Sequence, residues 1–170
     1  MNFHDLIALA PAGDRIELGV CRGDSLRFIA AHPGLTFGVD SFEGMGDPTP
    51  RDIMPDGRNP YPRGRLREPL AKIAAKFPNP KIRLVKGWVP DVLRETLLAR
   101  PYAFAHIDLD HYAPTVAALD WLWGRMLPGG VLVCDDWFEG KDYLAAGAIN
   151  ERAKVRPFAG TIERKAYWIF

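Results

Sequence analysis

Short apolar segments that alternate with helix-forming segments are the feature of this chain that most restricts its fold. The strand-like segments span residues 15–20, 35–39, 81–85, 102–107 and 131–134, and the helix-like segments span residues 25–32, 68–77, 91–99, 115–126 and 143–154. Such alternation predicts a mostly parallel sheet with helices on both faces. Residues 158–163 and 165–170 form two further strands, and their connection is too short for a crossover, so they are expected to pair as an antiparallel hairpin. We therefore expect a doubly wound, mostly parallel, seven-stranded α/β sheet that ends in a hairpin.

The size and charge of the chain suit one domain with a small-molecule partner. Its 170 residues fit a single domain, residues 1–170, and a net charge of +1 (22 basic minus 21 acidic residues) gives no overall field for nucleic acid or an anionic membrane. No apolar run approaches the roughly 20 residues that span a bilayer, and the N-terminus lacks a basic, signal-like segment. Cys21 and Cys134 form no metal or redox spacing, which favours a reduced, cytoplasmic setting.

Prolines and glycines gather in residues 45–69, which hold six of the 15 prolines and three of the 16 glycines. Because proline lacks the N–H group that helices and sheet ladders use, this segment is expected to be a long loop. Loops of this length inside a compact domain are usually functional or mobile. Two interpretations stay open, namely a lid or substrate loop and a disordered surface insertion.

The residues that follow each strand form the candidate site, because ligands bind beyond the carboxyl ends of the strands in such sheets. After the first strand, Gly19 and Gly23 have the spacing G-x-x-x-G, which differs from the dinucleotide pattern G-x-G-x-x-G. This turn suits a ligand with an amino-acid head group. Glu17 would accept a hydrogen bond from its ammonium group, and N–H groups at the helix start near Ser25 would receive its carboxylate. A purely structural glycine turn is the alternative.

The second and third strands are followed by candidates for binding a nucleoside. Asp40, with Ser41 after it, lies about 20 residues beyond the glycine turn, where an acidic residue binds ribose hydroxyls in nucleotide-binding sheets. A cap or turn role is the alternative for Asp40. Gly87 and Trp88 follow the third strand, and Trp88 either stacks on an adenine or packs in the core.

Two acidic clusters follow the fourth and fifth strands. Asp108 and Asp110 end the fourth strand, and Asp135 and Asp136 end the fifth. Neighbouring carboxylates repel and raise one another's pKa unless a cation lies between them. All-oxygen ligands suit a hard cation such as Mg²⁺, Mn²⁺ or Ca²⁺. The sequence thus favours a metal site, the alternative being acids that cap helices or pair with Arg and Lys.

Other side chains that can carry chemistry have simpler interpretations. His111 lies just past a strand end, where a general base is useful, whereas His106 alternates within a strand and is expected to be packed. Trp121 and Trp123 lie in an expected helix and are predicted to belong to the core or to a partner surface. An exposed tryptophan surface would suit a homo-oligomer, so the oligomeric state is left open.

Five segments in this order resemble the metal-dependent, S-adenosylmethionine-dependent O-methyltransferases of the macrocin and aminocoumarin-sugar type: ELGVCRGDS, FGVDSFEG, KGWVPDVL, IDLDHYAPT and PGGVLVCDDW. The resemblance runs from about residue 15 to residue 137 and implies a Rossmann-like class I methyltransferase fold. It implies that Glu17, Gly19 and Gly23 lie in the cofactor loop and that Asp40 binds the ribose. With the other candidates at the strand ends, the expected cofactor-binding residues are Glu17, Gly19, Gly23, Ser25, Asp40, Ser41, Gly87, Trp88 and Asp108. It also implies that Asp108, Asp135 and Asp136 bind a divalent cation, with Asp110 or His111 as the general base.

The chain departs from this family in two places. Family members usually carry a longer N-terminal segment over the cofactor and substrate, and they commonly have a small residue and a Glu where this chain has Leu109 and Ala113. Both departures affect the expected substrate more than the cofactor.

The expected reaction is methyl transfer from S-adenosylmethionine to a hydroxyl of a sugar, catechol or similar small molecule, assisted by a divalent cation, with Mg²⁺ the first candidate. The alternative is a non-catalytic S-adenosylmethionine-binding or scaffold protein. A nicotinamide oxidoreductase and a nucleic-acid methyltransferase are disfavoured, because their sequence motifs are missing.

Overall fold

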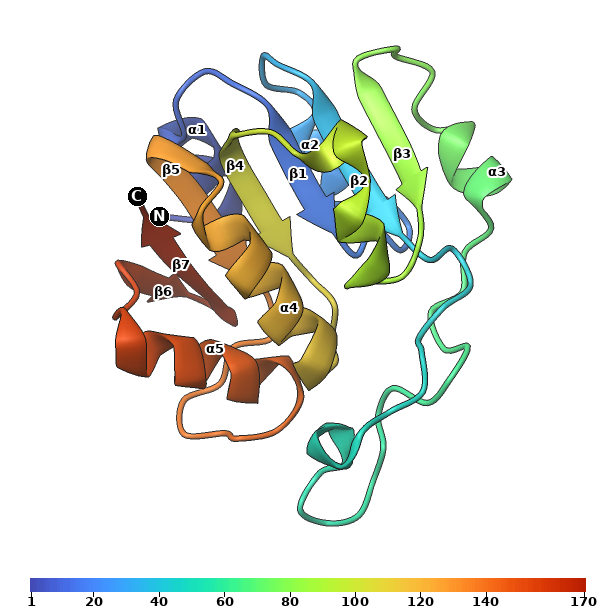
Figure 1. Cartoon of the computed structure of the whole chain (residues 1–170), viewed down its shortest axis with the longest axis vertical. Helices are drawn as coiled ribbons and strands as arrows, with labels where there is room; N and C mark the ends of the chain where they lie inside the picture. Colours follow the sequence, from blue (N-terminus) through green and yellow to red (C-terminus); the bar gives the residue numbers. More distant parts are fainter.

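The computed structural model describes all 170 residues and contains one seven-stranded sheet (Figure 1). The strands are β1 (Arg15–Leu18), β2 (Thr36–Asp40), β3 (Ile82–Lys86), β4 (Tyr102–Ile107), β5 (Met126–Cys134), β6 (Gly160–Ile162) and β7 (Lys165–Ile169). Their order is β3-β2-β1-β4-β5-β7-β6. Strands β1 to β5 are parallel, and β7 is antiparallel to both of its neighbours. The predicted sheet and its terminal hairpin are confirmed.

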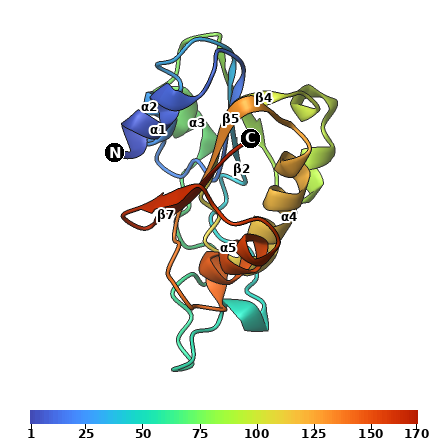
Figure 2. The same cartoon turned by 90° about the vertical axis from the view of Figure 1, so that its left-hand side faces the viewer.

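Helices cover both faces of this sheet, as Figure 2 shows. Helices α1 (Phe3–Leu9), α2 (Leu26–Ile29) and α3 (Leu70–Ala74) lie on one face, and α4 (Tyr112–Trp123) and α5 (Leu144–Val155) lie on the other. Three short 3₁₀ turns complete the chain: η1 (Pro50–Asp52), η2 (Asp91–Arg94) and η3 (Thr96–Leu98). No helix is both long and apolar enough to cross a membrane.

Two expectations about local structure were wrong, and one helix was not foreseen. Residues 91–99 form the turns η2 and η3 instead of a helix, because Glu95 is extended, and Asp91 caps nothing. The Pro-Gly-Gly segment at 128–130 lies inside β5 and does not separate it from α4. Helix α1 was not expected, although Asn2 and Asp5 form a capping box at its start.

Buried apolar side chains fill both interfaces between sheet and helices. A cluster of 20 buried residues extends from the sheet toward α4 and α5, and a smaller cluster of seven includes Leu6 and Ile7 of α1. Trp121 and Trp123 pack against the larger cluster, and Trp88 is the only exposed tryptophan. Packing against the core is therefore the interpretation of Trp121 and Trp123 that the structure supports.

Residues 45–69 form a loop that extends away from the sheet (Figure 1) and contacts α4 and α5 through η1. Asp52 is fully buried, and its carboxylate accepts hydrogen bonds from the Thr49 amide and hydroxyl and from the amide of Tyr112, each at 2.7 Å. On the returning limb, His111 Nε2 lies 3.0 Å from the carbonyl oxygen of Tyr61. The loop is thus fixed to the first turn of α4 at two points, unlike a disordered insertion.

Candidate functional site

A cavity of about 530 Å³ opens at the carboxyl ends of β1, β2, β3 and β4. Its wall combines residues after these strands with the loop 45–69. Six of the expected cofactor-binding residues line it, namely Gly19, Asp40, Ser41, Gly87, Trp88 and Asp108. Both expected catalytic residues, Asp110 and His111, line it as well. The topology therefore brings together side chains from four separate strand ends.

Two glycines of the first turn are required by the backbone. Gly19 has φ +92°, and a Cβ atom there would lie 1.8 Å from the carbonyl oxygen of Asp108. Gly23 has φ +79°, and a Cβ atom there would lie 2.7 Å from the ring of Phe77. Both positions are in the left-handed region that favours glycine. Only Gly19 lines the cavity, so the role of Gly23 in the structure is to let the turn pack.

The structure does not place two of the expected head-group ligands at the cavity. Glu17 is fully buried in β1, and its Oε1 lies 2.9 Å from His106 Nδ1 on the neighbouring strand β4. Ser25 precedes the four-residue helix α2 and makes no side-chain capping hydrogen bond. Neither residue is part of the cavity wall. A residue next to a glycine turn can thus face the sheet interior, because side chains alternate along a strand.

Asp40 lines the cavity while it holds the glycine turn in place. Its Oδ2 accepts hydrogen bonds from the amides of Val20 and Cys21 at 2.8 and 2.9 Å, and its Oδ1 accepts one from Phe42 at 2.7 Å. A carboxylate has about four acceptor positions, so one is left for a ligand hydroxyl. The turn role and the ribose role are therefore compatible.

Trp88 is on the surface of the cavity and not in the core. Its side chain is 42% exposed and faces Gly46 of the loop, where a Cβ atom would lie 3.2 Å from the indole ring. Gly87 before it allows close packing, since a Cβ atom there would lie 2.6 Å from Val92. An exposed indole in a cavity wall offers a flat face to a ring.

Carboxylates crowd the end of the cavity beyond β4 and β5. Oxygen atoms of Asp108, Asp110 and Asp136 lie within 4.8 Å of one another. Burial, together with the charges of Asp135, Asp136 and Glu17, raises the pKa of Asp108 to about 7. Burial and the hydrogen bond and charge of Asp136 likewise raise the pKa of Asp110. Asp108 and Asp110 therefore have no lysine or arginine partner in the structure, whereas Asp136 pairs with Arg164.

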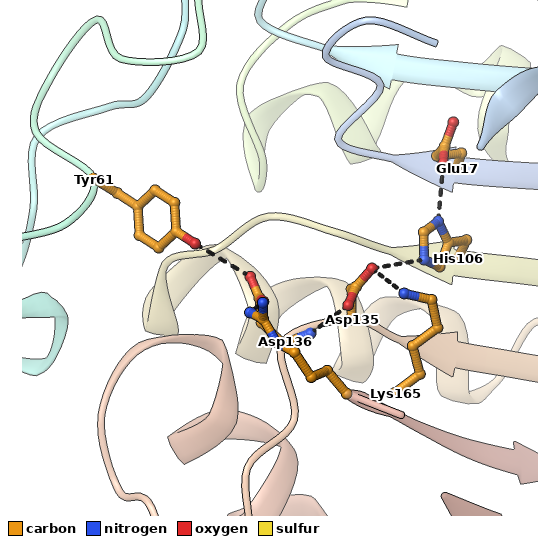
Figure 3. A network of polar contacts seen from close by, with 7 residues as sticks. Glu17, Tyr61, His106, Asp135, Asp136 and Lys165 are labelled. Atoms are coloured by element: carbon orange, nitrogen blue, oxygen red, sulfur yellow. Dashed lines mark hydrogen bonds and ion pairs between the residues drawn. The ribbon is translucent and has the colours of Figure 1, made fainter. Parts of the chain in front are cut away.

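Two adjacent basic side chains at the start of β7 contact the acids after β5, and Figure 3 shows Lys165 beside Asp135. Lys165 pairs with Asp135, and Arg164 pairs with Asp136. Burial disfavours ionisation of Asp135, but the hydrogen bond from Lys165 and the nearby positive charges lower its pKa overall. Pairing with Arg and Lys was the alternative that the sequence left open for these acids, but the sequence did not identify the two partners, which are adjacent at the start of the last strand. The expected metal ligand Asp135 is thus bound to a lysine, whereas Asp110 joins the carboxylate trio.

A line of polar groups continues from Asp135 into the sheet (Figure 3). His106 is buried between Glu17 and Asp135, with Nδ1 2.9 Å from the Glu17 carboxylate and Nε2 4.0 Å from the Asp135 carboxylate. Nε2 has no hydrogen-bond partner. Burial alone would lower the pKa of His106, but the hydrogen bond and charge of Glu17 raise it. His106 is a packed histidine, as expected, with an acidic partner that the sequence did not reveal.

His111 lies beside the carboxylate trio and touches the loop. Because the Tyr61 carbonyl can only accept a hydrogen bond, His111 Nε2 must carry the proton, and Nδ1 of the neutral ring is left as the acceptor. The Tyr61 hydroxyl lies 3.5 Å from Asp136 Oδ2 on the other side. Burial and the charges of Asp110 and Asp136 raise the pKa of Tyr61. Tyr61 was not expected in the site, since nothing distinguishes it within the proline-rich segment.

Comparisons with known proteins agree with this geometry. Residues 16–137 match the family model described as a methyltransferase domain. An 8-demethyl-8-(2,3-dimethoxy-alpha-L-rhamnosyl)-tetracenomycin-C 4'-O-methyltransferase from Streptomyces olivaceus is 32% identical over 139 residues, which are 74% of this chain and 53% of that protein. The chain therefore spans about half the length of this curated relative.

Solved structures share the fold. The O-methyltransferase NovP matches with a TM-score of 0.76 and 22% identity, over 98% of this chain and 76% of that one. The calicheamicin methyltransferase CalS11 matches with a TM-score of 0.78 and 20% identity, over 98% and 77% of the two chains. The strand order, the cavity at the strand ends and the matched family model agree, and this chain belongs to the methyltransferase domain family.

Proposed function

We propose that this protein transfers a methyl group from S-adenosylmethionine to a hydroxyl of a small molecule. One observation carries the proposal. A single cavity of about 530 Å³ joins the glycine turn, the acid after β2 and the indole after β3 to the polar groups after β4. A cofactor that extends along these strand ends would place its reactive end beside Asp108, Asp110 and His111.

The cofactor would be held by groups that already line the cavity. Gly19 allows close approach to the backbone, Asp40 has one acceptor position for a ribose hydroxyl, and Trp88 offers a ring face to adenine. Glu17, Gly23 and Ser25 support the turn from outside the cavity and are not proposed as direct contacts. S-adenosylmethionine supplies an electrophilic methyl group on a sulfonium.

The residues also fit a divalent cation. Asp108, Asp110 and Asp136 supply only carboxylate oxygens, and the raised pKa values of Asp108 and Asp110 reflect a negative charge that a cation would balance. Asp136 would have to share its carboxylate with Arg164, and Asp135 would join the set only if Lys165 moved away. When bound, such an ion lowers the pKa of a hydroxyl that it contacts. This set differs from the sequence expectation by exchanging Asp135 for Asp110.

His111 is the favoured base, and Asp110 is the second choice. The Tyr61 carbonyl fixes the proton of His111 on Nε2, so Nδ1 is available to take the proton of the acceptor hydroxyl. The transfer forms one O–C bond, breaks one C–S bond and leaves the electron pair on sulfur, while the hydroxyl proton moves to Nδ1. Asp110 is less free, because it shares a hydrogen bond with Asp136.

The relatives support a glycosidic acceptor. The Streptomyces olivaceus protein is named for methylation of a rhamnosyl group, and a further solved structure of CalS11 is described as a TDP-rhamnose 3'-O-methyltransferase. We extend this to a hydroxylated ring as the acceptor class. A small-molecule methyltransferase of this kind needs no nucleic-acid or membrane partner, and we propose that it acts in the cytoplasm.

Calorimetry with S-adenosylmethionine and S-adenosylhomocysteine tests the cofactor. We expect binding in the micromolar range for the wild type and strongly weakened binding for Asp40→Ala. Lys154→Ala on the exposed surface of α5 is the control variant. Absence of binding at high micromolar concentration would contradict the proposal. Comparison of His111→Gln with Asp110→Asn then identifies the base, since loss of the base lowers kcat more than it raises KM.

One observation favours a non-catalytic binder as the second candidate. Lys165 and Arg164 already neutralise Asp135 and Asp136 without a metal. Such a protein would bind S-adenosylmethionine and transfer no methyl group. A cofactor complex that shows no turnover with any diol, catechol or sugar acceptor, with or without Mg²⁺, would support this candidate.

A further inference from the structure

A second, smaller cavity lies beside the acidic end of the first. It has a volume of about 190 Å³ and shares Tyr61 and Asp110 with the larger cavity. Its other walls come from the loop, from the segment between β5 and α5, and from the β6–β7 turn. A molecule in the smaller cavity would therefore meet a cofactor in the larger one across Tyr61 and Asp110.

The smaller cavity has an acidic end and a basic end. Asp110 and Asp136 form the acidic end, which faces Tyr61. Two cations also line this cavity and approach the ring of Phe138, with Lys141 Nζ 4.0 Å and Arg164 Cζ 4.7 Å from its centroid. Because Arg164 is in contact with Asp136, Lys141 alone forms the basic end.

Only one of these cations has an acidic partner. Arg164 is paired with Asp136, whereas no carboxylate lies within ion-pair distance of Lys141. Lys141 is therefore the cation of this cavity without an anionic partner, and an anion beside it would supply one. The basic end is thus suited to a carboxylate or phosphate group.

The size and the apolar walls define the rest of the ligand. At about 30 Å³ for each water molecule, 190 Å³ corresponds to about six waters, which is the space of one six-membered ring. Met54, Pro60 and Tyr143 give apolar and aromatic walls to such a ring. Pockets for drug-sized ligands are larger, at about 300–1,000 Å³.

We propose that the smaller cavity is the acceptor site and takes a single hydroxylated six-membered ring with an anionic substituent. The substituent pairs with Lys141, and the reacting hydroxyl reaches Asp110, which lines both cavities. This inference rests on the proposed function for its chemistry, but its binding claim concerns a separate cavity. The affinity of the smaller cavity should therefore be higher for anionic than for neutral rings, and this difference should depend on Lys141.

Matched pairs of probes test the charge requirement by calorimetry, with and without S-adenosylhomocysteine. The aromatic pair is 3,4-dihydroxybenzoate and catechol, and the sugar set is glucuronate, glucose 6-phosphate and glucose. In at least one family, we expect the anionic member to bind about tenfold more tightly than the neutral one, because a charge-assisted pair replaces water. The family that shows the preference identifies the ring type.

Lys141→Gln should reduce this preference to less than about twofold, while Lys154→Gln on exposed α5 should keep it. Equal affinities within every family, absence of binding at millimolar concentration, or a preference that survives Lys141→Gln would each overturn the inference. If S-adenosylhomocysteine binds and the preference is absent, the inference alone fails. If S-adenosylhomocysteine does not bind, the proposed function fails, and the probes on the free protein still decide the inference.

Discussion

Replacing His106 by leucine removes the only hydrogen-bond partner of a fully buried carboxylate. Glu17 is 0% exposed, its Oε1 contacts His106 Nδ1 at 2.9 Å, and its Oε2 has no partner. The two residues face each other across β1 and β4 in the register of the sheet. We expect the single variant His106→Leu to be strongly destabilised, because it leaves the carboxylate without compensation.

The expected magnitude follows from the two ways in which the variant can respond. Breaking a buried pair by removing one partner costs about 3–5 kcal/mol. The carboxylate can instead take up a proton, which costs about 1.4 kcal/mol for each pH unit above about 4.3, or about 3.7 kcal/mol at pH 7 and about 1 kcal/mol at pH 5. The destabilisation is therefore expected near 3–4 kcal/mol at pH 7 and to shrink as the pH falls to 5.

Urea unfolding followed by tryptophan fluorescence, with EDTA present, measures this effect. The double variant Glu17→Leu/His106→Leu should recover at least about 2 kcal/mol relative to His106→Leu alone, because an apolar pair replaces the buried charge. Arg94→Leu is the control, since the ion pair of Arg94 with Asp91 is 84% and 78% exposed and should matter little. Equal losses in the single and double variants, or a loss that is the same at pH 5 and pH 7, would refute the reasoning.

Three further predictions concern the cavity wall. Without metal, Asp108→Asn should raise the free energy of unfolding at pH 8, because it removes a charge on a group whose folded pKa of about 7 exceeds its unfolded pKa, and wild-type stability should accordingly fall as the pH rises from about 4 to 7. Mg²⁺ should offset this loss of stability in the wild type only, and a variant with wild-type Mg²⁺ affinity would exclude Asp108 as a ligand. Gly19→Ala should lower the free energy of unfolding by about 3 kcal/mol or prevent folding, because its Cβ would lie 1.8 Å from the Asp108 carbonyl oxygen. Gly124→Ala, whose Cβ would meet open space, should keep wild-type stability, and equal urea midpoints for the two variants would contradict this prediction. Asp52→Ala should lower the free energy of unfolding by about 2–3 kcal/mol and make residues 45–69 sensitive to limited proteolysis, because it removes three hydrogen bonds to a buried carboxylate. Asp56→Ala in the same loop should have neither effect, and unchanged cleavage in both variants would show that Asp52 does not hold the loop.

The parallel sheet was predictable because its signals are local. Each central strand is a short apolar run, and a hairpin was the only pairing that the tight turn at Arg164 allowed. The helix expected at 91–99 failed because Val92, Leu93 and Leu98 are all buried against the sheet, and an extended Glu95 is what lets the two short turns place them there. Apolar spacing alone does not distinguish these two solutions.

The site was less predictable than the fold because its decisive contacts join distant parts of the chain. Tyr61 reaches Asp136 across 75 residues, and Glu17 reaches His106 across 89. The sequence identified the acids at the strand ends, but it contains no signal for which acid receives Lys165. The choice between Asp135 and Asp110 as an expected ligand therefore depends on the three-dimensional arrangement of the β6–β7 turn.

The loop 45–69 is held by two hydrogen bonds to consecutive residues, His111 and Tyr112. Asp52 on the outgoing limb accepts the amide of Tyr112, and Tyr61 on the returning limb accepts the ring N–H of the preceding His111. If the returning limb lifts, His111 loses the carbonyl that keeps its proton on Nε2, and the imidazole is then free to place that proton on Nδ1 instead. The proposed base therefore keeps Nδ1 free to accept a proton only while the loop closes the wall of the cavity. Closure of the cavity and the protonation pattern of His111 are thus coupled without movement of a domain.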